Sequence, residues 1–532
     1  MTALWQTPED RYDLLQRLIN HQSVTFSEGE QSFPYLVRDL MMELDYFKER
    51  QHQITLEPAD DARHSVLVHY KAPTSKQTIV LISHFDTVGV EDFGTHESHA
   101  FDSADLEGLF KEEPTLLNQE SLKDFESGDY IFGRGVMDMK AGLMLHMSLI
   151  EKAIREAWDV NLVLVTVPDE EVNSLGMRTA VKALRRIKEA HDLEIKLHLN
   201  GEPTFQQASD DNSHYAYTGT IGKLMPAVLC YGRETHVGNP LNGVSSNFMF
   251  SFVNQEMEYN TAFQEEFEGE VTPLPLSLMN TNLKHHYDVQ TPFRTIGLYN
   301  VFTFKETPET VYAKFQEIVK KAAKSCETRY QDIMTQANYD MPVAIKVLSY
   351  KELKAYATKK LGADAVNAII DECLKAQSET HMQSIHIVDT LMHRCREIGP
   401  AMVTFFAPPY YPSVNTSYNG EVESILETIR TTSAERFNRE SKRLHYFNGI
   451  CDLSYVRKDA SLEDIDTFVD QTPVYNYSYE IAADDIEAIS APVLNCGPIG
   501  KDAHKISERL HKESAFNELP VILESIVKKH FI

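Results

Sequence analysis

The sequence lacks a hydrophobic run long enough to cross a membrane. Although 42% of its 532 residues are hydrophobic, no segment approaches the roughly 18 uninterrupted apolar residues that a membrane helix needs. The first residues, Met1 to Gln6, lack the basic end and apolar stretch of a secretion signal. Thr7-Pro8-Glu9-Asp10 instead predicts a helix start, with Thr as N-cap and Pro in the first turn. We therefore expect no membrane association and a cytoplasmic protein whose mature chain begins near Met1.

Cysteine and basic residues are also scarce. The six cysteines form no CxxC pair and show no regular spacing, which argues against a disulfide framework or a cysteine-rich metal site and indicates reduced, buried thiols. The 51 Lys and Arg residues stand against 79 Asp and Glu residues. The resulting net charge of −28 argues against nucleic-acid binding, which needs a basic surface.

Two common hydrolase motifs are absent as well. The chain has no Gly-x-Ser-x-Gly segment, which argues against a serine hydrolase with a nucleophile elbow. His96-Glu97-Ser98-His99 is no zincin motif, because a zincin has two residues between the Glu and the second His. A hydrolytic activity would therefore need different residues.

The first two hundred residues alternate between strand-like and helix-like segments. Thr78 to His84 and Asn161 to Val167 are nearly all apolar, which is typical of strands buried on both faces. Met139 to Trp158 and Asn173 to His191 are predicted helices, and Ile195 to Asn200 is another predicted strand. This alternation predicts an α/β fold with a mixed central sheet and helices on both faces.

The pattern changes after about residue 210, where turn signals and short strand-like runs replace the alternation. We interpret this region as a smaller inserted α/β lid domain. Pro342 to Tyr350 and Val403 to Pro408 are strand-like again, and we expect them to return to the main sheet. The predicted division gives residues 1–214 and 333–532 to a main domain, the latter with extra segments, and residues 215–332 to the lid.

Polar residues follow three of the predicted strands. The segments are Ser83-His84-Phe85-Asp86, Pro168-Asp169-Glu170-Glu171 and Asn200-Gly201-Glu202. Because sites in α/β sheets lie at the carboxyl ends of strands, we expect these segments to converge. His84 and Asp86 share one face of their strand, so Asp86 could accept the second N–H of a metal-bound His84. Taken alone, the pair is as readily a polar strand end.

A glycine-rich turn carries a further aspartate. In Gly133-Arg134-Gly135-Val136-Met137-Asp138 the glycines permit an unusual backbone path before a helix rich in Met and Leu. Asp138 can direct its two oxygens at two cations there, or it can simply cap the helix.

The acids of Asp169-Glu170-Glu171 repel one another unless a cation or a proton offsets their charge. One of them can bind a metal while its neighbour accepts the proton of a metal-bound water. A solvated acidic turn is the ordinary alternative.

A set of five residues completes a candidate metal site. Glu202 follows a strand, and His504 lies in a loop near the C-terminus, four residues before Glu508. Two imidazoles and three carboxylates suit zinc, with cobalt or manganese as alternatives. The five candidate ligands are His84, Asp138, Glu171, Glu202 and His504.

Together these motifs resemble the co-catalytic zinc peptidase and amidohydrolase family that includes aminoacylase, succinyl-diaminopimelate desuccinylase, acetylornithine deacetylase and glutamate carboxypeptidase. The matching stretches occur in family order, at residues 83–88, 127–142, 169–171, 201–203 and 497–508. The extra length around residues 336–400 and 433–479 is similar to the RocB-like arginine-utilisation branch.

The resemblance implies a role for each candidate residue. Asp138 would bridge two zinc ions, with His84 and Glu202 completing one site and Glu171 and His504 the other. Glu170 would be the general base, and Asp86 would orient His84. The family's bridging aspartate precedes a cis peptide bond, which makes Asp138–Met139 a candidate for one.

The family's lid motif matches Gly232 to Asn247. By resemblance, His236 would stabilise the oxyanion of the substrate's carbonyl group, and in dimeric relatives this histidine comes from the partner subunit. Asn247 would contact substrate. Relatives that bind a substrate carboxylate often use an arginine where this chain has Lys305, and Arg294 is a second candidate. Lys lacks the planar fork of Arg, so a preference for a free α-carboxylate stays open.

The resemblance thus implies a hydrolase with two metal ions that cleaves an amide or peptide bond of a small substrate. An N-acyl amino acid and a short peptide are equally open as substrates, and the RocB-like features suggest a link to arginine or amino-acid catabolism. A homodimer is compatible with the lid, and no nucleic-acid partner is expected. The alternative is a non-catalytic descendant that binds a metabolite or a partner, although the chain retains every expected ligand and the base.

Overall fold

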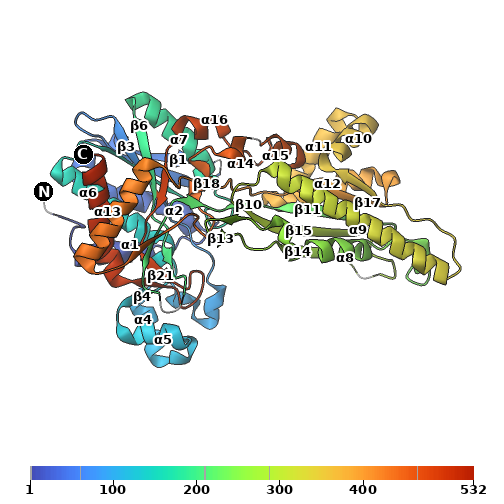
Figure 1. Cartoon of the computed structure of the whole chain (residues 1–532), viewed down its shortest axis with the longest axis horizontal. Coiled ribbons are helices and arrows are strands. Elements are labelled where there is room, and N and C mark those ends of the chain that lie inside the picture. Colours follow the sequence, from blue (N-terminus) through green and yellow to red (C-terminus); the bar gives the residue numbers. More distant parts are fainter. Residues whose placement is uncertain (1–2, 60, 209–210, 285, 287, 464) are drawn as a thin grey trace. The chain divides into compact units, whose positions relative to one another are not determined.

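The structure is a computed structural model that describes residues 3–59, 61–208, 211–284, 286, 288–463 and 465–532 (Figure 1). The chain divides into two compact units. The first comprises Met1–Thr220, Val414–Lys458 and Ala482–Ile532, and the second comprises Ile221–Ser413 and Asp459–Ile481. Within the described residues, none of the helices has the length and apolar character needed to span a membrane.

The first unit is built on an eight-stranded sheet. Its strand order is β1 (Ile54–Pro58), β2 (His64–Tyr70), β5 (Asn161–Val167), β3 (Gln77–His84), β6 (Glu194–Asn200), β20 (Val493–Asn495), β8 (His214–Tyr217) and β19 (Ser441–Leu444). Strand β3 runs parallel to β5 and β6, whereas β2 is antiparallel to β5. The sheet is therefore mixed, as the sequence predicted.

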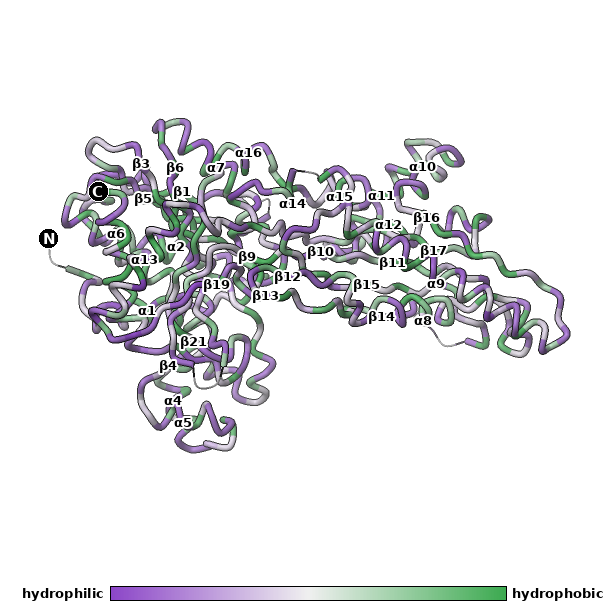
Figure 2. The backbone as a smooth tube through the Cα atoms, viewed as in Figure 1, coloured by the Kyte–Doolittle hydropathy of each residue, from purple (hydrophilic) through white to green (hydrophobic). Residues whose placement is uncertain are grey.

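Helices cover both faces of this sheet, which confirms the predicted fold class. On β3, Ile79 and Leu81 join one hydrophobic core with α1, α2, α6, α13 and α17, and Figure 2 shows hydrophobic residues gathered around α6. Val80 and Ile82 are equally buried and point to the opposite face, because side chains alternate along a strand. Helix α7 packs there against β1, β2 and β5. The helix bounds are α1 (Pro8–Asn20), α2 (Glu28–Met41), α3 (Asp45–Lys48), α4 (Ser103–Glu112), α5 (Gln119–Ser127), α6 (Ala141–Glu156), α7 (Leu175–His191), α13 (Gly420–Phe437), α16 (Ala483–Ile489) and α17 (Leu519–His530).

A second, four-stranded sheet lies in the same unit. Its strand order is β4 (Tyr130–Phe132), β22 (Arg509–His511), β21 (Ile499–Lys501) and β7 (Thr204–Phe205). Strands β4 and β22 are antiparallel, with Phe132 opposite Arg509. The segment that follows β4 and the loop that precedes β22 therefore meet at the same end of this strand pair.

The second unit has its own sheet. The strand order is β10 (Gly222–Leu224), β15 (Arg294–Thr303), β11 (Pro226–Tyr231), β17 (Ala401–Phe406) and β16 (Lys346–Ser349), and β14 (Leu276–Asn282) also pairs with β15. Helix α8 packs against β11 and β15, whereas α9 packs against β16 and β17. The helix bounds are α8 (Ser246–Met257), α9 (Pro308–Gln336), α10 (Tyr350–Leu361), α11 (Ala363–Ala376), α12 (Thr380–Arg394), α14 (Ala460–Glu463) and α15 (Asp466–Gln471).

The expected return of residues 342–350 and 403–408 to the main sheet is wrong. Strand β17 pairs antiparallel with β11, and β16 pairs parallel with β17, so both strands belong to the sheet of the second unit. An apolar run indicates a strand but does not select its partner. The predicted lid range of 215–332 therefore covers only part of the second unit.

Candidate metal centre

The carboxyl ends of three neighbouring strands bring the candidate ligands together. Strand β3 is paired in parallel with β5 on one side and β6 on the other, so all three end at one edge of the sheet. His84 is the last residue of β3. The acidic turn with Glu170 and Glu171 follows β5, and Glu202 follows β6. The three polar segments therefore converge, as the sequence predicted.

Asp138 lies between the two histidines. The Nε2 atom of His84 lies 3.2 Å from Oδ1 of Asp138 and 3.4 Å from Oε1 of Glu202. The Nε2 atom of His504 lies 3.2 Å from Oδ2 of Asp138 and 3.1 Å from Oε2 of Glu171. Asp138 thus presents one oxygen to each histidine, which is the arrangement of a bridging ligand.

These separations fit bound divalent cations. Two donors at about 2.0–2.1 Å from one tetrahedral zinc ion lie about 3.3–3.4 Å apart, and the contacts of Asp138 and the two histidines span 3.1 to 3.4 Å. Among the described residues, His84 groups with Asp138 and Glu171 and also with Glu170 and Glu202, with donor atoms within 4.8 Å of one another. The donor set therefore suits a pair of metal ions. That these ions are zinc stays a proposal.

The acids of the centre compete for protons because they are buried together. Burial raises the pKa of Glu170 well above its ordinary value, and Glu202 and Asp452 add to the increase against the opposing effect of His84. Burial likewise raises the pKa of Glu202 to about 7. The contacts with Asp138 and Glu171 raise the pKa of His504 to about 11. Without metal, the centre therefore holds protons that a cation must displace.

We expect metal binding to release protons and to tighten as pH rises. Because metal ligands must be deprotonated, Glu202 with a pKa near 7 and His504 with a pKa near 11 both lose protons on binding. The dissociation constant should therefore fall steadily from about pH 6 to about pH 9. Calorimetric titration in two buffers of different ionisation enthalpy measures the released protons directly, and a pH-independent affinity without proton release would contradict the expectation.

Asp86 supports the acidic turn more directly than it supports His84. The Nδ1 atom of His84 lies 3.0 Å from the main-chain oxygen of Asp86 and 3.5 Å from its carboxylate. The carboxylate instead accepts the backbone N–H groups of Glu170 at 3.0 Å and Glu171 at 3.2 Å. The Asp86 side chain therefore holds the backbone of Glu170 and Glu171 in place. Its role in orienting His84 stays a prediction.

The backbone before Asp138 depends on glycine. Gly135 has a φ of 76°, and a Cβ atom there would lie 2.8 Å from Cγ2 of Thr87. A side chain at this position would meet both an unfavourable backbone conformation and a steric clash. The peptide bond between Asp138 and Met139 is cis, as the resemblance implied.

Sequence reasoning missed a buried ion cluster next to the acidic turn. Nη1 of Arg63 lies 2.7 Å from Oδ1 of Asp169 and 3.1 Å from Oε1 of Glu30. Glu30 also accepts the backbone N–H of Asp169 at 2.9 Å. Asp169 has a φ of 68° and directly precedes Glu170. The cluster fixes the start of the turn, and no local pattern connects residues so far apart in the chain.

Asp452 is a second residue that sequence reasoning missed. Burial raises its pKa to about 8, against the opposing effects of His84 and Ser174. It lies in a segment that the sequence predicted only as extra length. The negative charge of Asp452 contributes to the raised pKa of Glu170, so Asp452 lies within electrostatic reach of the proposed base.

The remaining predicted site residues belong to the second unit. His236 is exposed, and its Nδ1 atom accepts the backbone N–H of Gly238 at 3.0 Å. Oδ1 of Asn247 accepts the hydroxyl of Thr295 at 2.6 Å. Their contacts with substrate remain predictions.

The two cationic candidates have different surroundings. Arg294 forms an ion pair of 2.7 Å with Asp389 on α12. Lys305 is exposed, and its ammonium lies 4.3 Å from the centre of the Phe267 ring. Arg294 is thus already engaged by a carboxylate, whereas the ammonium of Lys305 lies over a ring face.

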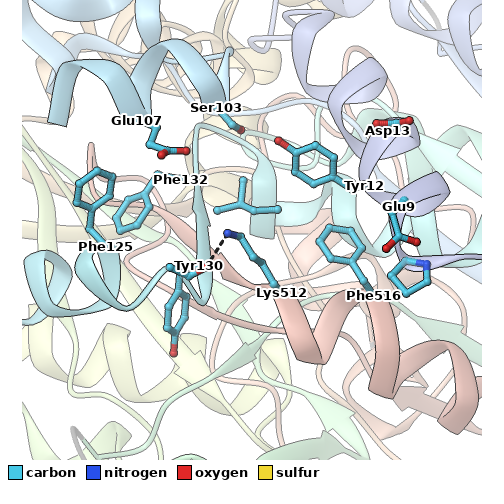
Figure 3. Close-up of a pocket in the computed structure, with 13 residues that line it drawn as sticks. Glu9, Tyr12, Asp13, Ser103, Glu107, Phe125, Tyr130, Phe132, Lys512 and Phe516 are labelled. Carbon is cyan, nitrogen blue, oxygen red and sulfur yellow. Dashed lines mark hydrogen bonds between the residues drawn. The ribbon is translucent and has the colours of Figure 1, made fainter. Parts of the chain in front are cut away.

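The first unit also contains a cavity of about 490 Å³ that none of the predicted site residues line. Figure 3 shows the rings of Tyr12, Phe132 and Phe516 around it, with Lys512 and Glu107 among the polar groups. The ammonium of Lys512 donates to the main-chain carbonyl of Gly128 at 2.6 Å. The cavity takes no part in the metal centre.

Comparisons with known proteins agree with this geometry. Residues 103–510 match the family described as Peptidase family M20/M25/M40. The uncharacterized protein YqjN of Bacillus subtilis (strain 168) is 36% identical over 98% of this chain and 96% of its own length, and protein RocB of the same organism is 27% identical over 97% and 94%.

A solved structure shares the fold. An M20 family metallo-carboxypeptidase from Sulfolobus solfataricus, Sso-CP2, has a TM-score of 0.57 over 97% of this chain and 98% of that chain, at 10% identity. This likeness shows the fold alone, whereas the family match and the full-length relative show the family. The chain belongs to peptidase family M20/M25/M40 and is a metal-dependent hydrolase that acts on amide bonds.

Proposed function

We propose that the chain hydrolyses an amide or peptide bond of a small substrate, an N-acyl amino acid or a short peptide, at a centre of two zinc ions. The ligands are His84, Asp138, Glu171, Glu202 and His504, and cobalt or manganese can replace zinc. The observation that carries the proposal is the position of Asp138, which directs one oxygen at each histidine at 3.2 Å.

Glu170 acts as the general base in this proposal. Its Oε2 atom lies 3.8 Å from Nε2 of His84, farther than the nearest oxygens of Asp138 and Glu202. Metal ions held by these five residues would supply Lewis acidity and would lower the pKa of the attacking water. Glu170 would accept a proton from the attacking water and deliver it to the leaving amine. Its raised pKa suits this exchange, because a carboxylate with a raised pKa is a stronger base.

The resemblance to the family supports the substrate contacts in this proposal. His236 donates to the carbonyl oxygen of the scissile bond and stabilises the oxyanion. Asn247 contacts the substrate, and Lys305 is favoured over Arg294 for a substrate carboxylate because Asp389 already pairs with Arg294. The similarity to RocB supports the further proposal of a role in amino-acid catabolism, with arginine derivatives as substrates to test first.

A substrate panel tests the proposal. The purified chain, loaded with zinc, cobalt or manganese, is incubated with N-acyl amino acids and dipeptides, including arginine derivatives, and the released amine is quantified. We expect metal-dependent turnover of at least one class, abolished by a chelator. Tight binding of two metal ions without turnover of any compound would favour the non-catalytic alternative.

A further inference from the structure

Two loops that carry metal ligands leave the same end of the β4–β22 strand pair. The chain passes from β4 through Arg134 to Asp138, and from His504 through Glu508 into β22. Because Phe132 lies opposite Arg509, Arg134 and Glu508 emerge side by side. The remaining ligands, His84, Glu171 and Glu202, follow strands of the large sheet instead.

Arg134 and Glu508 form a buried ion pair between these loops. Nη1 of Arg134 lies 2.9 Å from Oε2 of Glu508, and each side chain is only 1% exposed. The other end of the Arg134 guanidinium, Nη2, lies 2.5 Å from Asp92. The planar guanidinium therefore meets a carboxylate at each of its two terminal nitrogens, which fixes its orientation.

Glu508 also contacts the backbone that leads to Asp138. Its Oε1 atom accepts the backbone N–H of Met137 at 3.4 Å, and its main-chain carbonyl accepts the N–H of Gly133 at 3.2 Å. Met137 directly precedes Asp138, so movement of Glu508 would be transmitted to the bridging carboxylate. One buried acid thus joins the two loops through its side chain and its main chain.

The His504 loop is held by hydrogen bonds within the loop and by the residues at its two ends. Residues 502–508 contain no helix or strand, and the His504 side chain is 47% exposed. Apart from its contacts with Asp138 and Glu171, its position depends on the anchors of the loop. An ion pair of 2.5 Å between Asp502 and the buried Arg509 joins the two ends of the loop. Glu508 is the anchor on the side of the bridging aspartate.

We propose that Arg134 and Glu508 are positioning residues for one of the two metal ions, the one held by Asp138, Glu171 and His504. This inference rests on the proposed two-metal function. The pair fixes the two loops that supply Asp138 and His504. The other ion also has His84 and Glu202 as ligands, and these follow strands of the large sheet. Loss of the pair therefore disturbs two ligands of the ion held by His504 and only the shared Asp138 of the other ion, so it weakens the His504 ion more.

The expected effect is measurable in metal affinity. Removing an outer partner of metal ligands typically weakens metal binding by about 10–100-fold. In Arg134→Met and Glu508→Gln, the dissociation constant of the ion held by His504 should rise by this factor, while that of the ion held by His84 and Glu202 should change by less than about 3-fold. Arg134→Lys keeps the charge but not the fork, so it should restore only part of the affinity.

The experiment titrates the full-length, metal-free chain with zinc and measures bound metal by mass spectrometry and calorimetry. Arg439→Met is the matched control, because Arg439 pairs with the buried Glu518 at 2.6 Å and contacts neither metal loop. It should bind two ions normally. The double variant Arg134→Met/Glu508→Met removes both buried charges together, which avoids leaving one unpaired. It should fold and still lose affinity for the ion held by His504.

Each outcome decides between this proposal and its failure. Two ions bound with unchanged affinity in Glu508→Gln or in the double variant would overturn it. Failure of all three loss-of-pair variants to fold, while Arg439→Met folds, would assign the pair to the fold and would also overturn it. A wild-type chain that binds fewer than two ions would contradict the proposed function itself, before the variants are considered.

Discussion

Replacing Glu170 with glutamine is expected to lower kcat by about 10³-fold or more while both metal ions stay bound. Glutamine preserves the size of the side chain but cannot accept a proton, and general acid–base catalysis contributes about 10²–10⁴-fold. The backbone N–H of residue 170 still donates to Asp86, so the turn should keep its conformation. Steady-state kinetics and metal content on the same preparation check both halves of the prediction.

The matched control for this variant is Glu171→Gln. Its carboxylate lies 3.1 Å from His504 and is a proposed ligand, so the same substitution one residue later should reduce the affinity for one metal ion. Near-normal turnover in Glu170→Gln would remove Glu170 from the mechanism. Loss of a metal ion in Glu170→Gln would instead make Glu170 a ligand, which its position within donor distance of His84 and Glu202 also allows.

Replacing Asp138 with alanine is expected to empty both metal positions and to abolish activity. Asp138 is the one candidate ligand whose two oxygens contact different histidines, each at 3.2 Å. Because loss of an outer-shell partner alone costs about 10–100-fold in affinity, loss of this shared ligand should weaken each ion by more than about 100-fold. Metal titration of the variant measures the two affinities separately.

Glu202→Ala provides the comparison for Asp138→Ala. Glu202 contacts His84 at 3.4 Å, whereas His504 contacts Asp138 and Glu171, so loss of Glu202 should weaken one ion and spare the other. Circular dichroism of both variants checks that the fold is intact. If Asp138→Ala lost only one ion, the shared ligand would have to be another residue.

The strands of the central sheet could be predicted from the sequence because their pattern is local. The predicted strand Asn161 to Val167 agrees with β5 residue for residue, and Thr78 to His84 agrees with β3 to within one residue. Continuous apolar runs and the polar residues that end them are visible without knowledge of the partner strands. For the same reason, the candidate ligands at these strand ends could be located.

Long-range pairings could not be predicted in this way. Strand β17 has the composition of a core strand, yet its partner is β11, more than a hundred residues earlier. The contacts of Arg63 with Asp169 and of Arg134 with Glu508 likewise join distant segments, and a single charged residue carries no mark of its partner. The sequence offers Arg294 as a substrate-binding candidate for the same reason, because its partner Asp389 lies on a helix far along the chain.

The metal content of the wild-type chain tests the central claim most directly. The chain is purified, stripped with a chelator, reloaded with zinc and dialysed, and its metal is quantified against protein concentration. The proposed ligands predict two zinc ions per chain, with activity returning as the second ion binds. A chain that holds no zinc after reloading, or that is fully active after complete removal of metal, would contradict a two-metal hydrolase.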